Sequence, residues 1–167
     1  MDKKSFSFLT AVEIFLLSPD GKEVLLLKRA EDKEVLPGYY GGVGGKMDSD
    51  FVESPPEAAY REIWEETGYE SDDIAGFSLK ALFTVHDRFG KWNVFEFVGQ
   101  VREKRFDRQK KMEEGVLEWV PIDGLGGVKL IKDLRSGNLE KILSTEQLLW
   151  VKVRYDGSDS LELIELS

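Results

Sequence analysis

Apolar residues on both faces of an extended backbone mark the first part of the chain. In residues 5–17 they occupy alternating positions on both sides, Phe6 included, and Glu13 is one of two polar exceptions. Strands that are covered on both faces show this pattern. A turn signal at 18–21 follows, and 23–28 returns as a short buried run. The two runs predict a β-hairpin.

Two further pairs of strands are expected. Residues 77–86 and 91–101 flank a turn that contains glycine, and the second run is apolar on both faces, which indicates a central strand. Residues 148–155 and 161–166 alternate around a turn at 156–159. They predict a hairpin at the C-terminal end of the sequence.

Residues 55–67 carry the signals of an α-helix with defined ends. Ser54 suits the N-cap, proline follows at the first helical position, and Glu57 completes a capping box. Gly68 is placed to end the helix. A second, shorter helix is predicted around 139–143. The apolar stripe of the first helix consists of Ala58, Ala59 and Ile63.

Carboxylates gather on one face of the first helix. Glu62, Glu65 and Glu66 are spaced i, i+3 and i+4, and Glu53 precedes the cap and could fold back toward them. Arg61 can offset part of their mutual repulsion, but it cannot neutralise four carboxylates. Hard oxygen ligands of this kind suit Mg²⁺ or Mn²⁺, which also bind phosphate oxygens. The alternative is an ordinary solvated face in an acidic protein.

Composition narrows the function classes. The 167 residues suit a single domain, with a core at about 6–143 and a hairpin extension at 146–167. The absence of cysteine excludes disulfides, zinc thiolate sites and cysteine nucleophiles. A net charge of −9 argues against a general nucleic-acid or membrane surface. Neither a signal peptide nor a membrane span is recognisable, so we expect a cytoplasmic protein.

Glycines and basic residues supply candidate phosphate contacts. The run at 41–45, which Lys46 follows, is either a flexible linker or a cradle whose backbone N–H groups approach oxygens closely. Arg29 ends a predicted strand and is either a phosphate contact or a solvated strand end. The basic patch at 102–111 is expected to be a solvated loop, and His86, the only histidine, a polar residue beside a turn.

The segment as a whole resembles the Nudix box. The residues that carry the resemblance are Gly45, Glu53, Arg61-Glu62-Ile63, Glu65-Glu66 and Gly68-Tyr69. From Glu53 onward every spacing agrees with the family pattern, with Tyr69 in place of an aliphatic residue. Between Gly45 and Glu53 the chain is two residues longer than the pattern, which a loop insertion explains. The stretch 112–123 resembles a second diagnostic segment, in which an acidic residue lies near a glycine and a Trp-aliphatic-Pro strand follows.

The resemblance implies an α/β/α sandwich with a mixed sheet, and hydrolysis of a nucleoside diphosphate derivative by water attacking phosphorus. It implies that Glu62, Glu65 and Glu66, with the carbonyl of Gly45, hold Mg²⁺ or Mn²⁺. Glu114, with Glu113 as the alternative, would add a metal contact. Either Glu62 or Glu114 would act as the base, while Arg61 would orient Glu53 or Glu62.

The substrate is less defined. Residues 38–46 look like the segment before the box in oxidised-purine nucleotide hydrolases, but Tyr40 and Gly41 replace the usual Trp-Asn pair. Tyr40, Lys46 and Arg29 are the candidate substrate contacts. A nucleoside triphosphate, oxidised or not, is the first choice, with ADP-ribose or a dinucleoside polyphosphate as alternatives and an RNA 5′ end less favoured.

Two classes of protein without catalytic activity are the alternatives to an enzyme. One is a Nudix-fold nucleotide-binding regulator without turnover, which usually lacks one of the paired glutamates. The other is an acidic interaction domain, whose helix would lie far from Gly45. The hairpin at 146–167 is compatible with an extended sheet or with a homodimer interface.

Overall fold

Ten strands form one mixed sheet in the computed structural model, which describes residues 8–48, 52–107, 109–156, 158 and 161–167, the last segment as backbone up to 166. The strand order is β10-β9-β5-β6-β1-β2-β8-β7, with β3 beside β2 and β4 beside β1. The strands are β1 (Leu9–Leu17), β2 (Glu23–Arg29), β3 (Tyr40–Gly41), β4 (Val43–Lys46), β5 (Ile74–Asp87), β6 (Gly90–Val101), β7 (Gln109–Met112), β8 (Gly115–Pro121), β9 (Leu149–Tyr155) and β10 (Leu161–Leu166).

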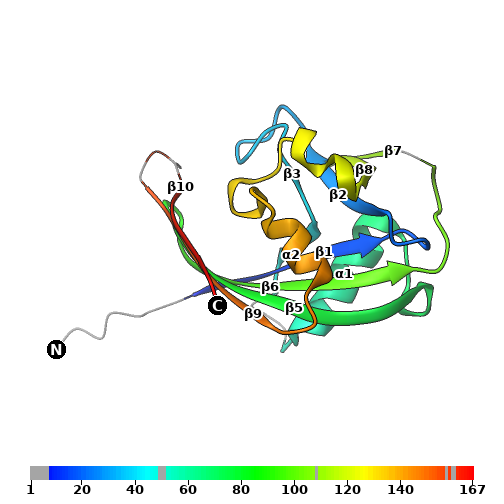
Figure 1. The fold of residues 1–167 in the computed structure, drawn as a ribbon, viewed down its shortest axis with the longest axis horizontal. Helices are drawn as coiled ribbons and strands as arrows, with labels where there is room; N and C mark the ends of the chain where they lie inside the picture. The colour runs from blue at the N-terminus through cyan, green and yellow to red at the C-terminus, as the bar shows by residue number, and fades with distance from the viewer. Residues whose placement is uncertain (1–7, 49–51, 108, 157, 159–160) are drawn as a thin grey trace.

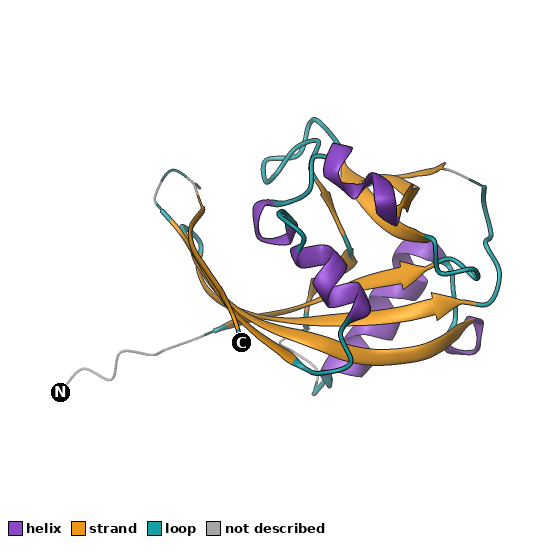
Figure 2. Ribbon diagram, in the orientation of Figure 1, coloured by secondary structure: helices purple, strands orange, loops and turns teal. Residues whose placement is uncertain are grey.

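Helices cover both faces of this sheet (Figures 1 and 2). The longest helix, α1 (Pro55–Thr67), packs on one side, and α2 (Asn138–Ser144) lies on the other. The described residues also include three short 3₁₀ helices, η1 (Ser71–Asp73), η2 (Ile122–Gly127) and η3 (Lys132–Leu134). The expected α/β/α sandwich with a C-terminal hairpin is confirmed.

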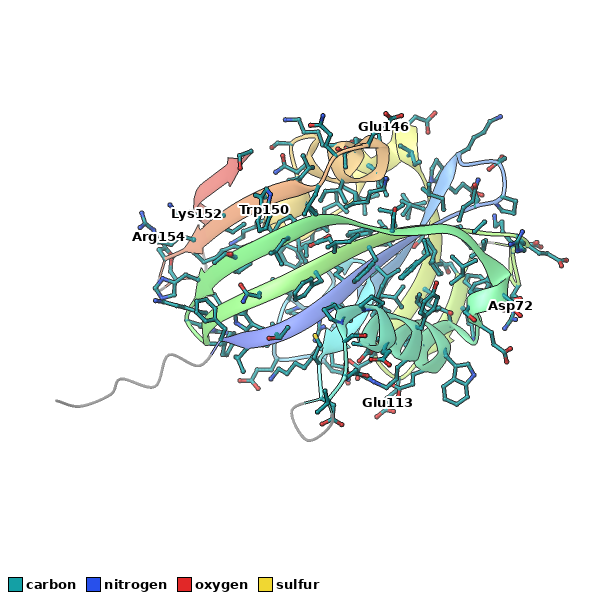
Figure 3. The ribbon with its side chains drawn as sticks, turned by 90° about the horizontal axis from the view of Figure 1, so that it is seen from below. Asp72, Glu113, Glu146, Trp150, Lys152 and Arg154 are labelled. Carbon is teal, nitrogen blue, oxygen red and sulfur yellow. The ribbon has the colours of Figure 1, made fainter. Side chains whose placement is uncertain are left out.

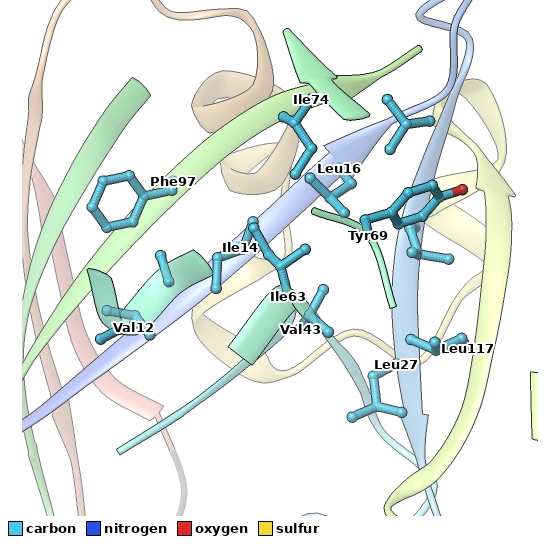
Figure 4. Packing of buried hydrophobic residues seen from close by; sticks show 14 of the residues in the cluster. Val12, Ile14, Leu16, Leu27, Val43, Ile63, Tyr69, Ile74, Phe97 and Leu117 are labelled. Atoms are coloured by element: carbon cyan, nitrogen blue, oxygen red, sulfur yellow. The ribbon is translucent and has the colours of Figure 1, made fainter. Parts of the chain in front are cut away.

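Strand β1 contributes to both hydrophobic cores, as its pattern predicted. Val12, Ile14 and Leu16 pack against Ile63 of α1, a cluster that Figure 4 shows. Phe15 points to the α2 side of the sheet. The predicted strand began at residue 5, but Phe6 and the other residues up to 7 lie outside the described part. On the α2 side, the core includes Leu26, Phe83, Leu139, Ile142 and Val151.

Strands β1 and β2 pair over only part of their length and then separate. β1 pairs with β2 only at Leu16↔Leu25 and Leu17↔Val24, and further along its edge it pairs with β4. On its other edge β1 runs parallel to β6 over its whole length. Strand β2 continues instead with β8, which is antiparallel to it. The edges that separate in this way leave room for a cavity between them.

The first helix has the ends that its sequence predicts. The Ser54 hydroxyl accepts a hydrogen bond from the Glu57 amide, and the Glu57 carboxylate accepts one from the Ser54 amide at 2.8 Å. Gly68 adopts φ 78°, a left-handed conformation that glycine tolerates best, and its N–H donates to the Trp64 carbonyl. Helix α1 is thereby fixed at both ends before any tertiary contact is considered.

The basic patch at 102–111 is the predicted exposed loop over 102–107, but it also makes contacts that were not predicted. Lys104 binds Glu23 at 2.7 Å and Arg105 binds Asp73 at 2.6 Å, so these side chains tie the segment to other elements. The patch then enters β7, which pairs with β8. Arg108 lies outside the described residues. Ion pairs between residues far apart in the sequence and strand pairing are long-range effects, which explains why composition did not reveal them.

The C-terminal hairpin belongs to the sheet itself. Strand β9 runs parallel to β5 and antiparallel to β10, while much of the predicted turn, including Asp159, lies outside the described residues. Val151 and Val153 enter the α2-side core. Trp150, Lys152 and Arg154 lie on the outer face of β9 (Figure 3). No helix within the described ranges is long and apolar enough to cross a membrane.

Candidate active site

The glycine strand and the carboxylate helix lie against each other. Strand β4 places Gly45 opposite Val12 of β1, and α1 packs beside it. A Cβ atom added to Gly45 would lie 2.6 Å from Glu62 Oε1, so a larger residue would displace the carboxylate from this position. The Gly44 amide donates a hydrogen bond to Glu66 Oε2 at 3.2 Å. The helix is therefore not remote from Gly45, as an accidental match to the box would have placed it.

Arg61 organises the acidic face. Its Nε and Nη2 atoms donate to the two oxygens of Glu53, at 2.8 and 3.2 Å, in a bidentate contact. Its Nη1 atom donates to Glu62 at 2.7 Å and to Glu65 at 3.4 Å. The guanidinium group holds the pKa of Glu53 below its usual value. Arg61 thus orients both Glu53 and Glu62, the two partners that the resemblance offered for it.

Negative charge remains on this face despite Arg61. Burial raises the pKa of Glu62, although the neighbouring guanidinium opposes the change. Burial, followed by the charge of Glu62, raises the pKa of Glu66 to about 8. Glu65 stays more exposed, with 48% of its side chain accessible. A carboxylate that is difficult to ionise beside two others is the electrostatic setting that a divalent cation relieves.

The donor set fits Mg²⁺ or Mn²⁺, provided that the side chains rearrange. Carboxylate oxygens and a backbone carbonyl are hard ligands of the kind that both ions prefer. As they stand, the described residues include no group of three acidic or histidine side chains already positioned to hold a metal. Arg61 is bound to Glu62 and Glu65, and a cation would compete with it for their oxygens.

A cavity of about 760 Å³ opens beside the carboxylates. Its wall includes Glu62, Glu65 and Glu66 from α1, and Glu113 and Glu114 from the β7–β8 turn. Glu114 is 43% exposed and forms an ion pair with Lys33 at 3.2 Å. The two acidic segments singled out in the sequence therefore meet across one cavity.

The predicted substrate contacts are placed unequally. Arg29 lines the cavity, and its Nε donates to the Val35 carbonyl at 2.8 Å. Lys46 instead lies over the Trp92 ring, 5.3 Å from its centroid. The Tyr40 hydroxyl donates to Glu118 at 2.9 Å, and neither Tyr40 nor Lys46 belongs to the residues that line this cavity. Lys110, which was not proposed as a contact, does line it.

Sequence reasoning missed a second group of acids. Glu13 lies opposite Glu96 in the parallel register of β1 and β6, and it accepts a hydrogen bond from the Gly42 amide at 2.6 Å. Asp133 of η3 is the third member of this group. The only signal in the sequence was an acidic residue within each of two largely apolar strands. Their convergence depends on a strand pairing that local patterns do not specify.

Burial changes the protonation of this group. It raises the pKa of Glu96 well above its ordinary value, and that of Asp133 to about 6. It also raises the pKa of Glu13 to about 7, with the charge of Asp133 as the next cause. At neutral pH these three acids therefore cannot all be charged, and the group retains protons.

Comparisons with known proteins agree with this geometry. The NUDIX domain family model matches residues 8–142. A mutator MutT protein from Bacillus halodurans has a similar structure, with a TM-score of 0.73 and 24% identity, over 96% of this chain and 98% of that one. A MutT protein from Methanosarcina mazei Go1 is similar with a TM-score of 0.54 and 25% identity, over 83% of this chain and 92% of that one. The NUDIX domain of Shewanella oneidensis NrtR, complexed with ADP ribose, is similar with a TM-score of 0.59 and 19% identity, over 85% of this chain and 89% of that one.

The matched range spans most of the chain and contains the glycine strand, the carboxylate helix and the turn that carries Glu114. The fold and the order of these elements agree with it. The chain belongs to the Nudix hydrolase family.

Proposed function

We propose that the protein hydrolyses a phosphoanhydride bond in a nucleoside diphosphate derivative, and that its substrate is a nucleoside triphosphate, oxidised or not, which yields the monophosphate and pyrophosphate. The observation that carries the proposal is the acidic cluster of Glu62, Glu65 and Glu66, which lies against the β4 glycines at the wall of a large cavity.

The cluster implies divalent cations because its charge has the wrong sign for the substrate. A pyrophosphate group would be repelled by several carboxylates unless cations lay between them. Glu62, Glu65 and Glu66 would hold Mg²⁺ or Mn²⁺, with the Gly45 carbonyl and Glu114 as further ligands. The bound metal would supply a water of lowered pKa and neutralise charge on the phosphate oxygens.

Glu114 is the better placed of the two candidate bases. Its carboxylate lines the cavity and stays partly exposed, so it can reach a water molecule that approaches the substrate. Glu62 is nearly buried, and its Oε1 already accepts a hydrogen bond from Arg61 at 2.7 Å, so it is less accessible to that water molecule than Glu114 is. We therefore assign proton removal to Glu114 and assign metal binding to Glu62.

Arg61 and Glu53 serve as positioning residues. Glu53 fixes the guanidinium plane through two hydrogen bonds, and the guanidinium in turn directs Glu62. Groups that orient a metal ligand in this way typically affect metal affinity or activity by about 10-fold to 100-fold. Arg29 and Lys110 are the cationic side chains on the cavity wall that would meet phosphate oxygens.

Hydrolysis of a panel of nucleotides, with products identified, tests the proposal. The panel contains nucleoside triphosphates, ADP-ribose and a dinucleoside polyphosphate, each with Mg²⁺ and with a chelator. We expect a triphosphate to give monophosphate and pyrophosphate only when Mg²⁺ is present. Preferred cleavage of ADP-ribose, the ligand named for the Shewanella domain, would replace our choice of substrate. Tight nucleotide binding without any product would favour the regulator.

Substitutions distinguish the proposed role of Glu66 in metal binding from that of Glu114 in proton removal. Glu66→Gln should abolish most turnover and weaken Mg²⁺ binding. Glu114→Gln should lower kcat by about 10²-fold to 10⁴-fold, and the residual activity should still require Mg²⁺, because Glu62, Glu65 and Glu66 remain to hold it. Glu146→Gln, at an exposed position outside the cavity, is the matched control. Wild-type activity in Glu66→Gln at saturating metal and substrate would refute the role of the cluster.

A further inference from the structure

A second, smaller cavity adjoins the one that holds the acidic helix. It measures about 220 Å³, and Glu13, Leu36, Val94 and Ile131 line both spaces. Sites for complete small-molecule ligands usually occupy about 300–1,000 Å³, so this chamber suits one part of a ligand that also fills the larger cavity. Its apolar wall includes the aromatic residues Phe83, Phe89 and Trp92.

Buried oxygen atoms in the chamber have no partner. Glu96 is only 2% exposed, and its Oε2 accepts no hydrogen bond from the residues that the structure describes. Asp133 Oδ1 is likewise buried and unpaired within that part of the chain. Both side chains line the chamber. Because a buried polar atom without a partner costs about 1–3 kcal/mol, the chamber favours a ligand that brings donors to these atoms.

The hydrogen bonds that do exist identify both free oxygens as acceptors. Protonated Glu96 donates a hydrogen bond to Glu13, which also accepts one from the Gly42 amide. That donation leaves the other oxygen of Glu96 with lone pairs only. Asp133 accepts from the Tyr155 hydroxyl, so its second oxygen is also an acceptor. The remaining charged residues on the chamber wall are Asp87, Arg88 and Lys132.

We propose that Glu96 and Asp133 read the base of the nucleotide, and that they favour a base with two neighbouring N–H donors, a ring N–H beside an exocyclic amino group, as in guanine. The inference rests on the proposed nucleotide hydrolysis and extends it to base selection. Adenine pairs its amino group with a ring acceptor, and uracil flanks its N–H with two carbonyls. Either would leave one of the two buried oxygens unpaired. The aromatic wall provides surface on which a base can stack.

Comparison of GTP with inosine triphosphate tests the proposal, because the two differ only in the exocyclic amino group. We expect kcat/KM with Mg²⁺ to favour GTP over inosine triphosphate and over ATP by about 10-fold to 100-fold. Ribose 5-triphosphate, which has no base, reports on the phosphate machinery alone. Equal rates for the three nucleotides in the wild-type protein would overturn the inference and leave the proposed hydrolysis standing.

Variants identify the reading groups. Glu96→Gln keeps a donor toward Glu13 and an acceptor toward the chamber, so it should retain the preference for GTP. Glu96→Met removes both, and Asp133→Asn presents a donor where an acceptor is needed. Each should lower kcat/KM for GTP at least tenfold and leave ribose 5-triphosphate unchanged. One of the two acids must face the amino group, and its variant should bring the ratio of GTP to inosine triphosphate close to one.

A matched control and a second measurement keep the test decisive. Glu140 also has a buried, unpaired carboxylate oxygen, but it lines a different cavity, so Glu140→Met should not change base preference. Equal losses for all substrates in Glu96→Met would indicate a structural role and overturn the inference. If the wild-type protein hydrolyses no nucleotide, the proposed function fails. Calorimetric binding of GTP and inosine triphosphate with Mg²⁺ then tests the base preference by itself.

Discussion

At the scale of single residues, glutamates of the same helix face differ in environment. Glu65 is half exposed, Glu62 is nearly buried under Arg61, and Glu66 accepts a backbone amide with its pKa raised to about 8. Spacing along the helix predicted that they share a face, because that spacing is a local property. It could not predict their different protonation, which depends on β4 and on the β7–β8 turn.

The protonation of Glu96 leads to a prediction about stability. Its pKa is raised on folding, so above about pH 4.5 the unfolded chain releases a proton that the folded chain retains. The stabilising contribution of Glu96 is therefore fully present below that pH and is lost as the pH rises toward the folded-state pKa. Glu96→Gln cannot ionise, and it should reduce the loss by up to about 1.4 kcal/mol per pH unit. Denaturant unfolding between pH 5 and pH 8 measures the difference.

The exposed variant Glu146→Gln serves as the control for that titration, and it should follow the wild-type curve. Parallel stability curves for Glu96→Gln and the wild-type protein would mean that Glu96 is ionised in the fold. Glu13 adds to the loss over the same range, up to its folded-state pKa of about 7. The wild-type slope is therefore expected to decrease in Glu96→Gln without disappearing.

At the scale of elements, the site depends on how closely β4 approaches α1. The helix ends were predictable because Ser54, Glu57 and Gly68 act through local hydrogen bonds and backbone conformation. The approach itself was suggested only by the family resemblance, since nothing local brings a glycine strand to a helix that follows a loop. Strand β7 was missed for the same reason, because its partner β8 provides the pairing.

Gly45→Ala tests this approach directly. The added Cβ would lie 2.6 Å from Glu62 Oε1, so the carboxylate must move away from the strand. We expect turnover to fall at least tenfold, with the helical circular dichroism signal retained, because a displaced ligand costs about 10-fold to 100-fold or more. Gly124→Ala, where the nearest atom would be 3.8 Å away, is the matched control and should remain active. Full activity in Gly45→Ala would mean that turnover does not depend on the position of the Glu62 carboxylate.

At the scale of the whole molecule, the C-terminal hairpin contributes to the wall of the smaller chamber. Tyr155 of β9 donates to Asp133 and lines the smaller chamber, so the segment described as an extension reaches the candidate base site. The sequence predicted the hairpin through its alternation, but it did not indicate that β9 joins β5 in parallel. A homodimer through this segment stays a prediction.

Core truncations in β9 measure how far the fold depends on it. Val151→Ala with Val153→Ala removes four buried methyl groups, worth about 3 kcal/mol together. We expect the double variant to lower Tm by about 6–12 °C. Trp150→Ala, at a neighbouring position that is 56% exposed, should change Tm far less. A double variant as stable as the wild-type protein would mean that the packing of β9 contributes little to the stability of the fold.

The parallel pairing of β5 with β9 also constrains how the molecule is made. During synthesis, residues 74–87 emerge before 149–155, so one edge of β5 stays unpaired while the intervening residues are made. An uncovered strand edge can pair with other chains. The nascent protein therefore exposes an unpaired strand edge, with the risk of association that such an edge carries, until β9 has been made and has paired with β5.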